Sequence, residues 1–227
     1  MRPKIAVSIP ARSVSEASRM IRKAHRLGAD LAEIRLDYLE TEDRIDRIVQ
    51  IGAMPLIATF RSSLNGGARE VKQEKRLEAL VAAAEAGFEY VDVEVNTKGV
   101  QALVDRIHAA GARTIASHHD LKGTPSDIQL RRVLRLCRAT HATLSKLVTT
   151  VRRLDDNLRL LALVREASRS GGVVCFGMGK LGIHSRVFSP VYGAAFTFAS
   201  LNDRESVAPG QIPLRKMQRI YAELGYS

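Results

Sequence analysis

The chain has 227 residues, of which 45% are hydrophobic, and this length and composition suit one globular domain with a sizeable core. No apolar run approaches the roughly 18 residues of a membrane span, and the apolar stretch near Met1 is too short for a signal peptide, so we expect a cytoplasmic protein. The formal charge of +11 is scattered through predicted helices, and aromatic residues make up only 5%, which favours a small anionic substrate over nucleic acid.

Short β-branched runs alternate with longer amphipathic stretches along the chain. Strands are predicted at Ile5–Ile9, Leu31–Leu36, Leu56–Phe60, Tyr90–Val95, Thr114–His118, Thr143–Val148, Val173–Gly177 and Ala195–Ala199. Helices are predicted at Val14–Leu27, Asp43–Ile51, Ala68–Ala86, Val100–Ala110, Pro125–Cys137, Arg153–Ser168, Leu181–Ser185 and Leu214–Leu224. Several of these helices are followed at once by a glycine that can end them in a left-handed turn: Gly28, Gly52, Gly87 and Gly111.

This alternation predicts the fold class. Eight β/α units with short connections and no linker indicate an α/β protein, a (β/α)8 TIM barrel that occupies residues 1–227 as a single domain. The alternative is an open doubly wound sheet, which often carries a glycine-rich phosphate loop after its first strand. Here that segment reads SIPARS, without the G-x-G-x-x-G pattern.

A barrel carries its catalytic groups at the carboxyl ends of its strands, and charged residues lie at five successive predicted strand ends. They are Glu33, Arg35 and Asp37, which the period of two places on one face, then Arg61, Asp92 and Glu94, the run Ser117-His118-His119-Asp120, and Lys146. Each carboxylate can instead belong to a structural ion pair at the barrel mouth. His118 and His119 are adjacent in a strand, so only one of them can face inward.

Lys146 is the first catalytic candidate, since it is a lone charge in the apolar segment TLSKLVTT with nothing nearby in sequence to neutralise it. Burial lowers the pKa of an amine toward the range in which it can attack a carbonyl. The alternative is an edge-strand lysine whose head reaches water. The two cysteines, Cys137 and Cys175, lie in apolar elements without metal-ligand spacing, so we expect buried thiols and no metal site.

Several segments together resemble type I 3-dehydroquinate dehydratase, in the order of that family and across nearly the whole chain. They are EIRLDYLE from Glu33, ATFRS from Ala58, YVDVEV from Tyr90, SHHDLKGTP from Ser117, SKLVTT from Ser145, GIHSRVFSPVYGAAFTFASL from Gly182 and APGQI from Ala208. The resemblance implies a homodimeric barrel enzyme of the shikimate pathway. Such an enzyme converts 3-dehydroquinate to 3-dehydroshikimate by syn elimination of water through a lysine Schiff base, without metal or cofactor.

The resemblance also implies roles for individual residues. Lys146 would form the Schiff base, and His119 would be the general acid and base. Arg186 would bind the substrate carboxylate, Gln211 would belong to a loop that closes over the substrate, and four residues would be strand-end substrate contacts: Ser8, Glu33, Arg35 and Arg61.

Two positions depart from the family pattern. Asn65 stands where an acidic residue usually helps to hold the catalytic histidine, and Val207 stands where the closing loop usually has a serine, with Ser206 one place earlier. We expect the amide oxygen of Asn65 to accept a hydrogen bond from His119 instead. Two other functions stay open at this point: a lysine-imine aldolase acting on a related keto acid, and a catalytically silent barrel that binds a ligand.

Overall fold

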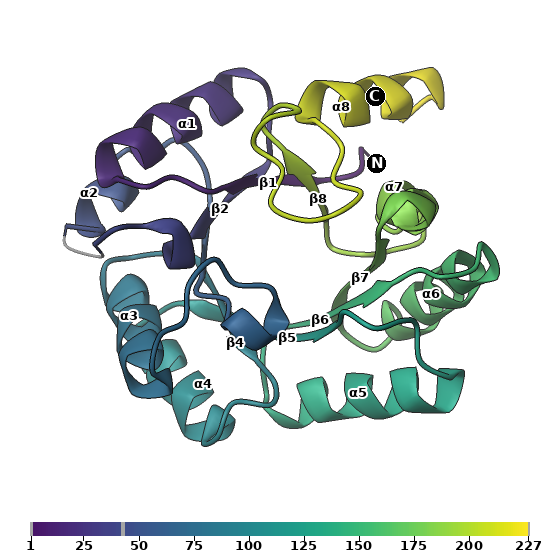
Figure 1. The fold of residues 1–227 in the computed structure, drawn as a ribbon, viewed down its shortest axis with the longest axis horizontal. Coiled ribbons are helices and arrows are strands. Elements are labelled where there is room, and N and C mark those ends of the chain that lie inside the picture. Colours follow the sequence, from purple (N-terminus) through teal and green to yellow (C-terminus); the bar gives the residue numbers. More distant parts are fainter. Residues whose placement is uncertain (1, 42–43, 227) are drawn as a thin grey trace.

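The computed structural model describes residues 2–41 and 44–226, and within them parallel strands form a central sheet ringed by helices (Figure 1). The strands are β1 Ile5–Ile9, β2 Leu31–Arg35, β3 Leu56–Thr59, β4 Tyr90–Glu94, β5 Arg113–Asp120, β6 Leu144–Thr150, β7 Gly172–Met178 and β8 Thr197–Ser200. The α-helices are α1 Val14–Arg26, α2 Asp46–Val49, α3 Gln73–Glu85, α4 Val100–Ala109, α5 Asp127–Ala139, α6 Asp155–Ala167, α7 Ile183–Phe188 and α8 Leu214–Glu223. Short 3-10 turns are η1 Leu36–Tyr38, η2 Ser63–Asn65 and η3 Lys180–Gly182.

The strand order confirms the barrel. Strands β1 to β7 pair in parallel with their neighbours in sequence, and β8 pairs with β1. Between β7 and β8 the Ala195 amide donates to the carbonyl of Val173 over 2.8 Å, which brings the two edges of the sheet together. A doubly wound sheet would reverse its strand order at a switch point, so that alternative is wrong.

The predicted elements are found near their expected positions, and the main differences lie at their ends. Strand β5 continues through Asp120 and β6 through Thr150, whereas β8 begins only at Thr197. Asp37 lies in the turn η1, so it does not continue the inward face of β2. Helix α3 begins at Gln73 instead of Ala68, because the Ala68 amide is held by the Asp37 carboxylate over 2.9 Å. The α2 segment forms a helix only from Asp46, and its predicted start at Asp43 lies outside the described residues.

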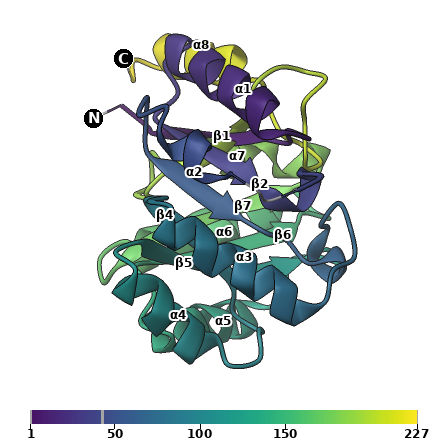
Figure 2. The same cartoon turned by 90° about the vertical axis from the view of Figure 1, so that its left-hand side faces the viewer.

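Helices α1 to α4 end just before the glycines that the sequence analysis expected to close them. Gly28, Gly52, Gly87 and Gly111 all have positive φ, between 58° and 101°, which a residue with a side chain rarely adopts. Helix α8 closes the ring beside α1, where the Gln218 amide donates to the carbonyl of Leu27 over 2.8 Å (Figure 2). The apolar faces of the helices pack on the outer faces of the strands in two clusters, a larger one around β1–β4 and a smaller one around β5–β7 with α5 and α6.

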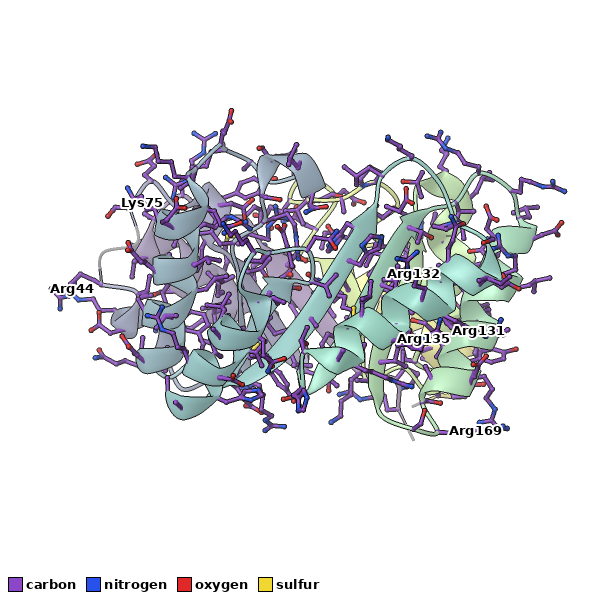
Figure 3. The ribbon with its side chains drawn as sticks, turned by 90° about the horizontal axis from the view of Figure 1, so that it is seen from below. Arg44, Lys75, Arg131, Arg132, Arg135 and Arg169 are labelled. Atoms are coloured by element: carbon purple, nitrogen blue, oxygen red, sulfur yellow. The ribbon has the colours of Figure 1, made fainter. Side chains whose placement is uncertain are left out.

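Positive side chains are spread over the outside of this ring. Figure 3 shows Arg131, Arg132 and Arg135 along α5, with Arg44 and Lys75 at the opposite end of the molecule. No helix within the described ranges is both long and apolar enough to cross a bilayer. Cys137 and Cys175 are buried free thiols, as expected, and burial raises the pKa of each to about 12.

The turn after β7 packs so tightly that it requires glycine. A Cβ added to Gly182 would lie 2.5 Å from the carbonyl carbon of Gly177 and 2.7 Å from its oxygen, and backbone atoms there cannot move aside cheaply. By contrast, a Cβ on Gly123 would meet nothing nearer than 3.9 Å. The close approach seats η3 and α7 directly on the end of β7.

We therefore expect Gly182→Ala to lower the free energy of unfolding by at least about 1–3 kcal/mol, the usual cost of overpacking. Urea denaturation followed by circular dichroism measures this quantity. Gly123→Ala is the control and should change it by less than about 0.5 kcal/mol. Equal stability of the two variants would mean that α7 can withdraw from β7 at no cost.

Candidate active site

A cavity of about 120 Å³ opens at the carboxyl ends of the strands, and residues of the loops that follow β3 and β8 line it. Figure 1 shows both loops on the same side of the barrel. All of the predicted site residues line it: Ser8, Glu33, Arg35, Arg61, His119, Lys146, Arg186 and Gln211. Residues that the sequence did not single out complete the wall, among them Thr59, Val148, Phe176, Met178 and Phe198. The two phenylalanines lie near the ends of predicted strands, so strand parity was the signal that could have placed them in the cavity.

Lys146 projects into this cavity from the middle of the sheet. Strand β6 pairs with β5 on one side and β7 on the other, and Lys146 is only 4% exposed, so the alternative of an edge-strand lysine is wrong. Its Nζ lies 2.9 Å from Asp92 Oδ2, 3.6 Å from Glu33 Oε1 and 4.2 Å from the centre of the Phe198 ring. Lys146 has no counter-charge within its own segment, as the sequence indicated, and both carboxylates come from other strands.

Asp92 is the centre of a buried ionic group. Its Oδ1 lies 2.9 Å from Arg61 Nη2 in an ion pair and accepts from Ser117 Oγ at 2.5 Å, while Oδ2 accepts from Lys146. Burial alone would raise the pKa of this carboxyl, but the charges of Arg61 and Lys146 outweigh it and hold the pKa well below its usual range. Asp92 therefore stays ionised and fixes the position of the Lys146 amine.

Glu33 connects Lys146 to the closing loop. Its Oε1 accepts from Thr59 Oγ1 at 2.9 Å, and its Oε2 accepts from Ser8 Oγ at 2.7 Å. Ser8 in turn accepts from Gln211 Nε2 at 3.0 Å, and Gln211 Oε1 accepts from the Val207 amide at 2.9 Å. These hydrogen bonds hold the loop after β8 over the cavity and connect it, through Glu33, to Lys146.

The remaining charges at the mouth form structural ion pairs, one of the two readings that the sequence allowed. Arg35 donates to both oxygens of Asp37, at 2.8 and 2.6 Å, and Asp37 then anchors the loop after β3 through Ala68. Burial lowers the pKa of Arg35, yet the hydrogen bonds and charge of Asp37 more than reverse this, so its pKa is raised. Glu94 likewise pairs with Arg76 at 2.9 Å.

His119 faces the cavity, and His118, which is half-buried, lies on the other face of β5. Burial, followed by the charges of Arg61 and Lys146, holds the pKa of His119 well below 6.5. The ring is therefore neutral at pH 7 and able to accept a proton. Its Nδ1 is buried and has no hydrogen-bond partner among the described residues.

The expected hydrogen bond from His119 to Asn65 is absent from the described part of the chain, so that expectation is wrong. Asn65 lines the same cavity, but its Nδ2 donates to Ser62 Oγ at 3.0 Å within the turn η2. Among the described residues no hydrogen bond joins the Asn65 amide oxygen to His119, and the His119 Nδ1 is without a partner. What fixes the Asn65 side chain is local loop geometry, which the family pattern did not reveal.

Arg186 is a buried cation that meets no carboxylate among the described residues. It is 1% exposed, its guanidinium lies 4.3 Å above the Phe176 ring, and Nη1 is 3.5 Å from the carbonyl of Phe198. Its Nε and Nη2 have no partner within residues 2–41 and 44–226. Burial lowers its pKa to about 9, so it still carries its charge at pH 7. Two free donors on one planar edge fit a carboxylate.

The fold and the cavity define a class: a (β/α)8-barrel enzyme in which a buried lysine, a neutral histidine and an unpaired arginine face one small space. Across the described ranges, no group of three or more His, Cys, Asp and Glu side chains is placed to hold a metal ion.

Comparison with known proteins identifies the family within this class. Residues 5–227 match the family described as type I 3-dehydroquinase. A 3-dehydroquinate dehydratase of Dehalococcoides mccartyi is 34% identical over 200 residues, which cover 88% of each chain, and one of Methanothermobacter thermautotrophicus is 30% identical over 99% of this chain and 98% of its own. The crystal structure of the Geobacillus kaustophilus enzyme superposes with a TM-score of 0.91 at 25% identity, covering 99% of this chain and 92% of that one.

The chain belongs to the type I 3-dehydroquinate dehydratase family, and it is a lyase of the shikimate pathway. The resemblance drawn from the seven sequence segments is therefore confirmed.

The unpaired guanidinium yields a prediction. We expect Arg186→Lys to raise KM for 3-dehydroquinate by at least about 10-fold, because an ammonium retains the charge but loses the two-donor fork. Arg186→Ala should cost more, roughly 2–5 kcal/mol of binding. Steady-state kinetics measures both, with the exposed Arg132→Lys on α5 as control. A KM equal to that of the unaltered enzyme would show that the substrate anion is held elsewhere.

Proposed function

We propose that Lys146 and His119 carry out the dehydration of 3-dehydroquinate, with Lys146 as the imine-forming amine and His119 as the proton carrier. One observation carries the proposal: the buried Lys146 amine faces the same cavity as a neutral histidine and an unpaired arginine. An amine, a base and an anion site are the groups that elimination through an imine requires.

Arg186 sets the direction of the substrate in this account. Its free Nε and Nη2 receive the carboxylate at the β7–β8 side of the cavity, above the Phe176 ring. Glu33 accepts from substrate hydroxyls, since a carboxylate has more acceptor positions than Ser8 and Thr59 occupy. Arg35 and Arg61 line the cavity but are already paired with Asp37 and Asp92, so direct contact with the substrate stays a prediction for both.

The first half of the reaction joins amine and ketone. Lys146 passes a proton to His119, and its nitrogen then attacks the C3 carbonyl to give a carbinolamine. The carbinolamine hydroxyl takes that proton back from His119 and leaves as water, which forms the iminium. The iminium is positive where the ammonium was, 2.9 Å from Asp92, so the same carboxylate stabilises both charges. Electron withdrawal by the iminium acidifies the neighbouring C2–H bond.

The second half eliminates water. His119 takes the C2 proton, and the electron pair moves into an enamine; the pair then expels the C1 hydroxyl, which leaves as water with the proton from His119. Water finally hydrolyses the conjugated iminium and frees Lys146. One water is lost overall, because the water consumed in hydrolysis replaces the one released when the imine formed.

The remaining predictions concern the two alternative functions, the domain organisation, the oligomeric state and the location. The family assignment leaves the aldolase and the silent barrel without support, although Asn65 and Val207 do line the cavity at the two departures from the family pattern. The single domain over residues 1–227, the homodimer and the cytoplasmic location stay predictions. Sedimentation velocity of the purified protein tests the second of these.

The formation of the conjugated enone, followed by its ultraviolet absorbance, tests the proposed roles. We expect His119→Ala to lower kcat on the order of 100-fold, within the range of general acid–base groups. His118→Ala on the opposite face of the strand is the matched control and should keep kcat within about 3-fold. A large fall in kcat for His118→Ala, with kcat of His119→Ala nearly unchanged, would mean that the proton carrier is His118 and that the assignment to His119 is wrong.

The pH profile adds a second readout to the same variants. Only neutral His119 can take the C2 proton, and burial holds its pKa well below 6.5, so kcat/KM should stay level near pH 7 and fall only below about pH 6.5. His118→Ala should retain that acid limb. An acid limb centred above pH 7 would contradict the assignment of a neutral His119.

A further inference from the structure

Arg186 lies on α7, a helix of six residues, and a helix that short needs outside support to hold a side chain in place. Helix α6 lies against both β7 and α7 (Figure 1). From its first turn α6 presents Asn157, which is 3% exposed and faces the start of α7. Asparagine is an unusual residue to bury, so its hydrogen bonds indicate what it does.

Asn157 makes four such bonds, and they join α6 to both ends of the η3–α7 junction. Its Nδ2 donates to the carbonyls of Leu154 and Leu181, at 3.1 and 2.9 Å. Its Oδ1 accepts from the backbone amide of Ser185 at 3.0 Å and from Ser185 Oγ at 2.7 Å. Both polar atoms of the amide are therefore satisfied without water.

Ser185 passes the constraint on to the barrel. Its Oγ accepts from the Gly177 amide on β7 at 2.9 Å, so the hydroxyl bridges α6 and the strand. Arg186 follows at once in the chain, and its own carbonyl accepts from Thr197 Oγ1 on β8 at 2.7 Å. The backbone that bears the guanidinium is thus fixed from α6, β7 and β8 together.

The guanidinium itself has no comparable support. Its nearest acceptor is the Phe198 carbonyl at 3.5 Å, and Nε and Nη2 are unpaired within the described residues. Guanidinium donors that stay free for a ligand cannot also be held by hydrogen bonds to the protein. Its orientation therefore depends on the Phe176 ring, 4.3 Å away, and on the backbone that carries the side chain.

We propose that Asn157 and Ser185 are positioning residues that set the guanidinium of Arg186 for the substrate carboxylate, and that they thereby control affinity and not the chemical step. The inference rests on the role proposed for Arg186. It assigns to α6, which contributes no residue to the cavity wall, a part in the recognition of the substrate anion.

The test is steady-state kinetics of Asn157→Ala and Ser185→Ala with 3-dehydroquinate, at a temperature well below the unfolding midpoint of each variant. We expect KM to rise about 10-fold in each, as for the loss of a buried hydrogen bond, with kcat within about 2-fold. Ser189→Ala is the matched control, since Ser189 is a buried serine directly after the same helix whose Oγ has no partner in the described part of the chain. Its KM should not change.

A double-mutant cycle separates positioning from general loosening. If Asn157 acts through Arg186, adding Asn157→Ala to Arg186→Lys should change KM by less than about 2-fold beyond Arg186→Lys alone. Ser185→Ala serves in the same cycle if Asn157→Ala does not fold. An unchanged KM in the single variants, or an equal fall in kcat, would overturn the inference.

The two proposals fail differently in this cycle. An unchanged KM in Arg186→Lys itself would overturn the role of Arg186. A raised KM in Arg186→Lys together with an unchanged KM in Asn157→Ala and Ser185→Ala would overturn only the part given to α6. Fully additive effects would mean that Asn157 acts on binding by a route that does not include Arg186.

Discussion

The contact on which the site depends is the buried ion pair between Asp92 and Lys146. A lone ammonium inside a barrel would be costly, and a carboxylate 2.9 Å away offsets that cost while leaving the amine in the cavity. Arg61 and Ser117 occupy the other oxygen of Asp92, so the carboxylate cannot turn away. The same arrangement that makes the lysine tolerable in the fold also prepares a place for the positive iminium.

The rest of the molecule divides its charges into paired and unpaired groups. Arg35, Arg61 and Arg76 each meet a carboxylate and hold the barrel mouth and its loops together. Within residues 2–41 and 44–226 Arg186 meets none, and two of its donors are left for a ligand. Because an unpaired buried cation is unfavourable, Arg186 attracts anions. The net charge of +11 adds to this attraction at longer range.

Local pattern was enough to predict the barrel and the inward direction of most site residues. The period of two showed that only one of His118 and His119 can face inward, and the family resemblance then selected His119 and supported Lys146. The partner of Lys146 did not follow, since Asp92 is 54 residues away on β4, and β5 lies between β4 and β6 in the sheet. The prediction for Asn65 failed for a local reason: its Nδ2 donates to Ser62 within its own turn, and this contact could not be read from the family pattern.

The most direct test of the central claim is reduction of the enzyme–substrate mixture with borohydride, followed by peptide mapping. Borohydride converts an imine to a stable secondary amine, so the account predicts a mass increase on the peptide that contains Lys146 and none in Lys146→Ala. A label on a different lysine, or no label during active turnover, would contradict the claim that Lys146 is the amine on which the substrate reacts.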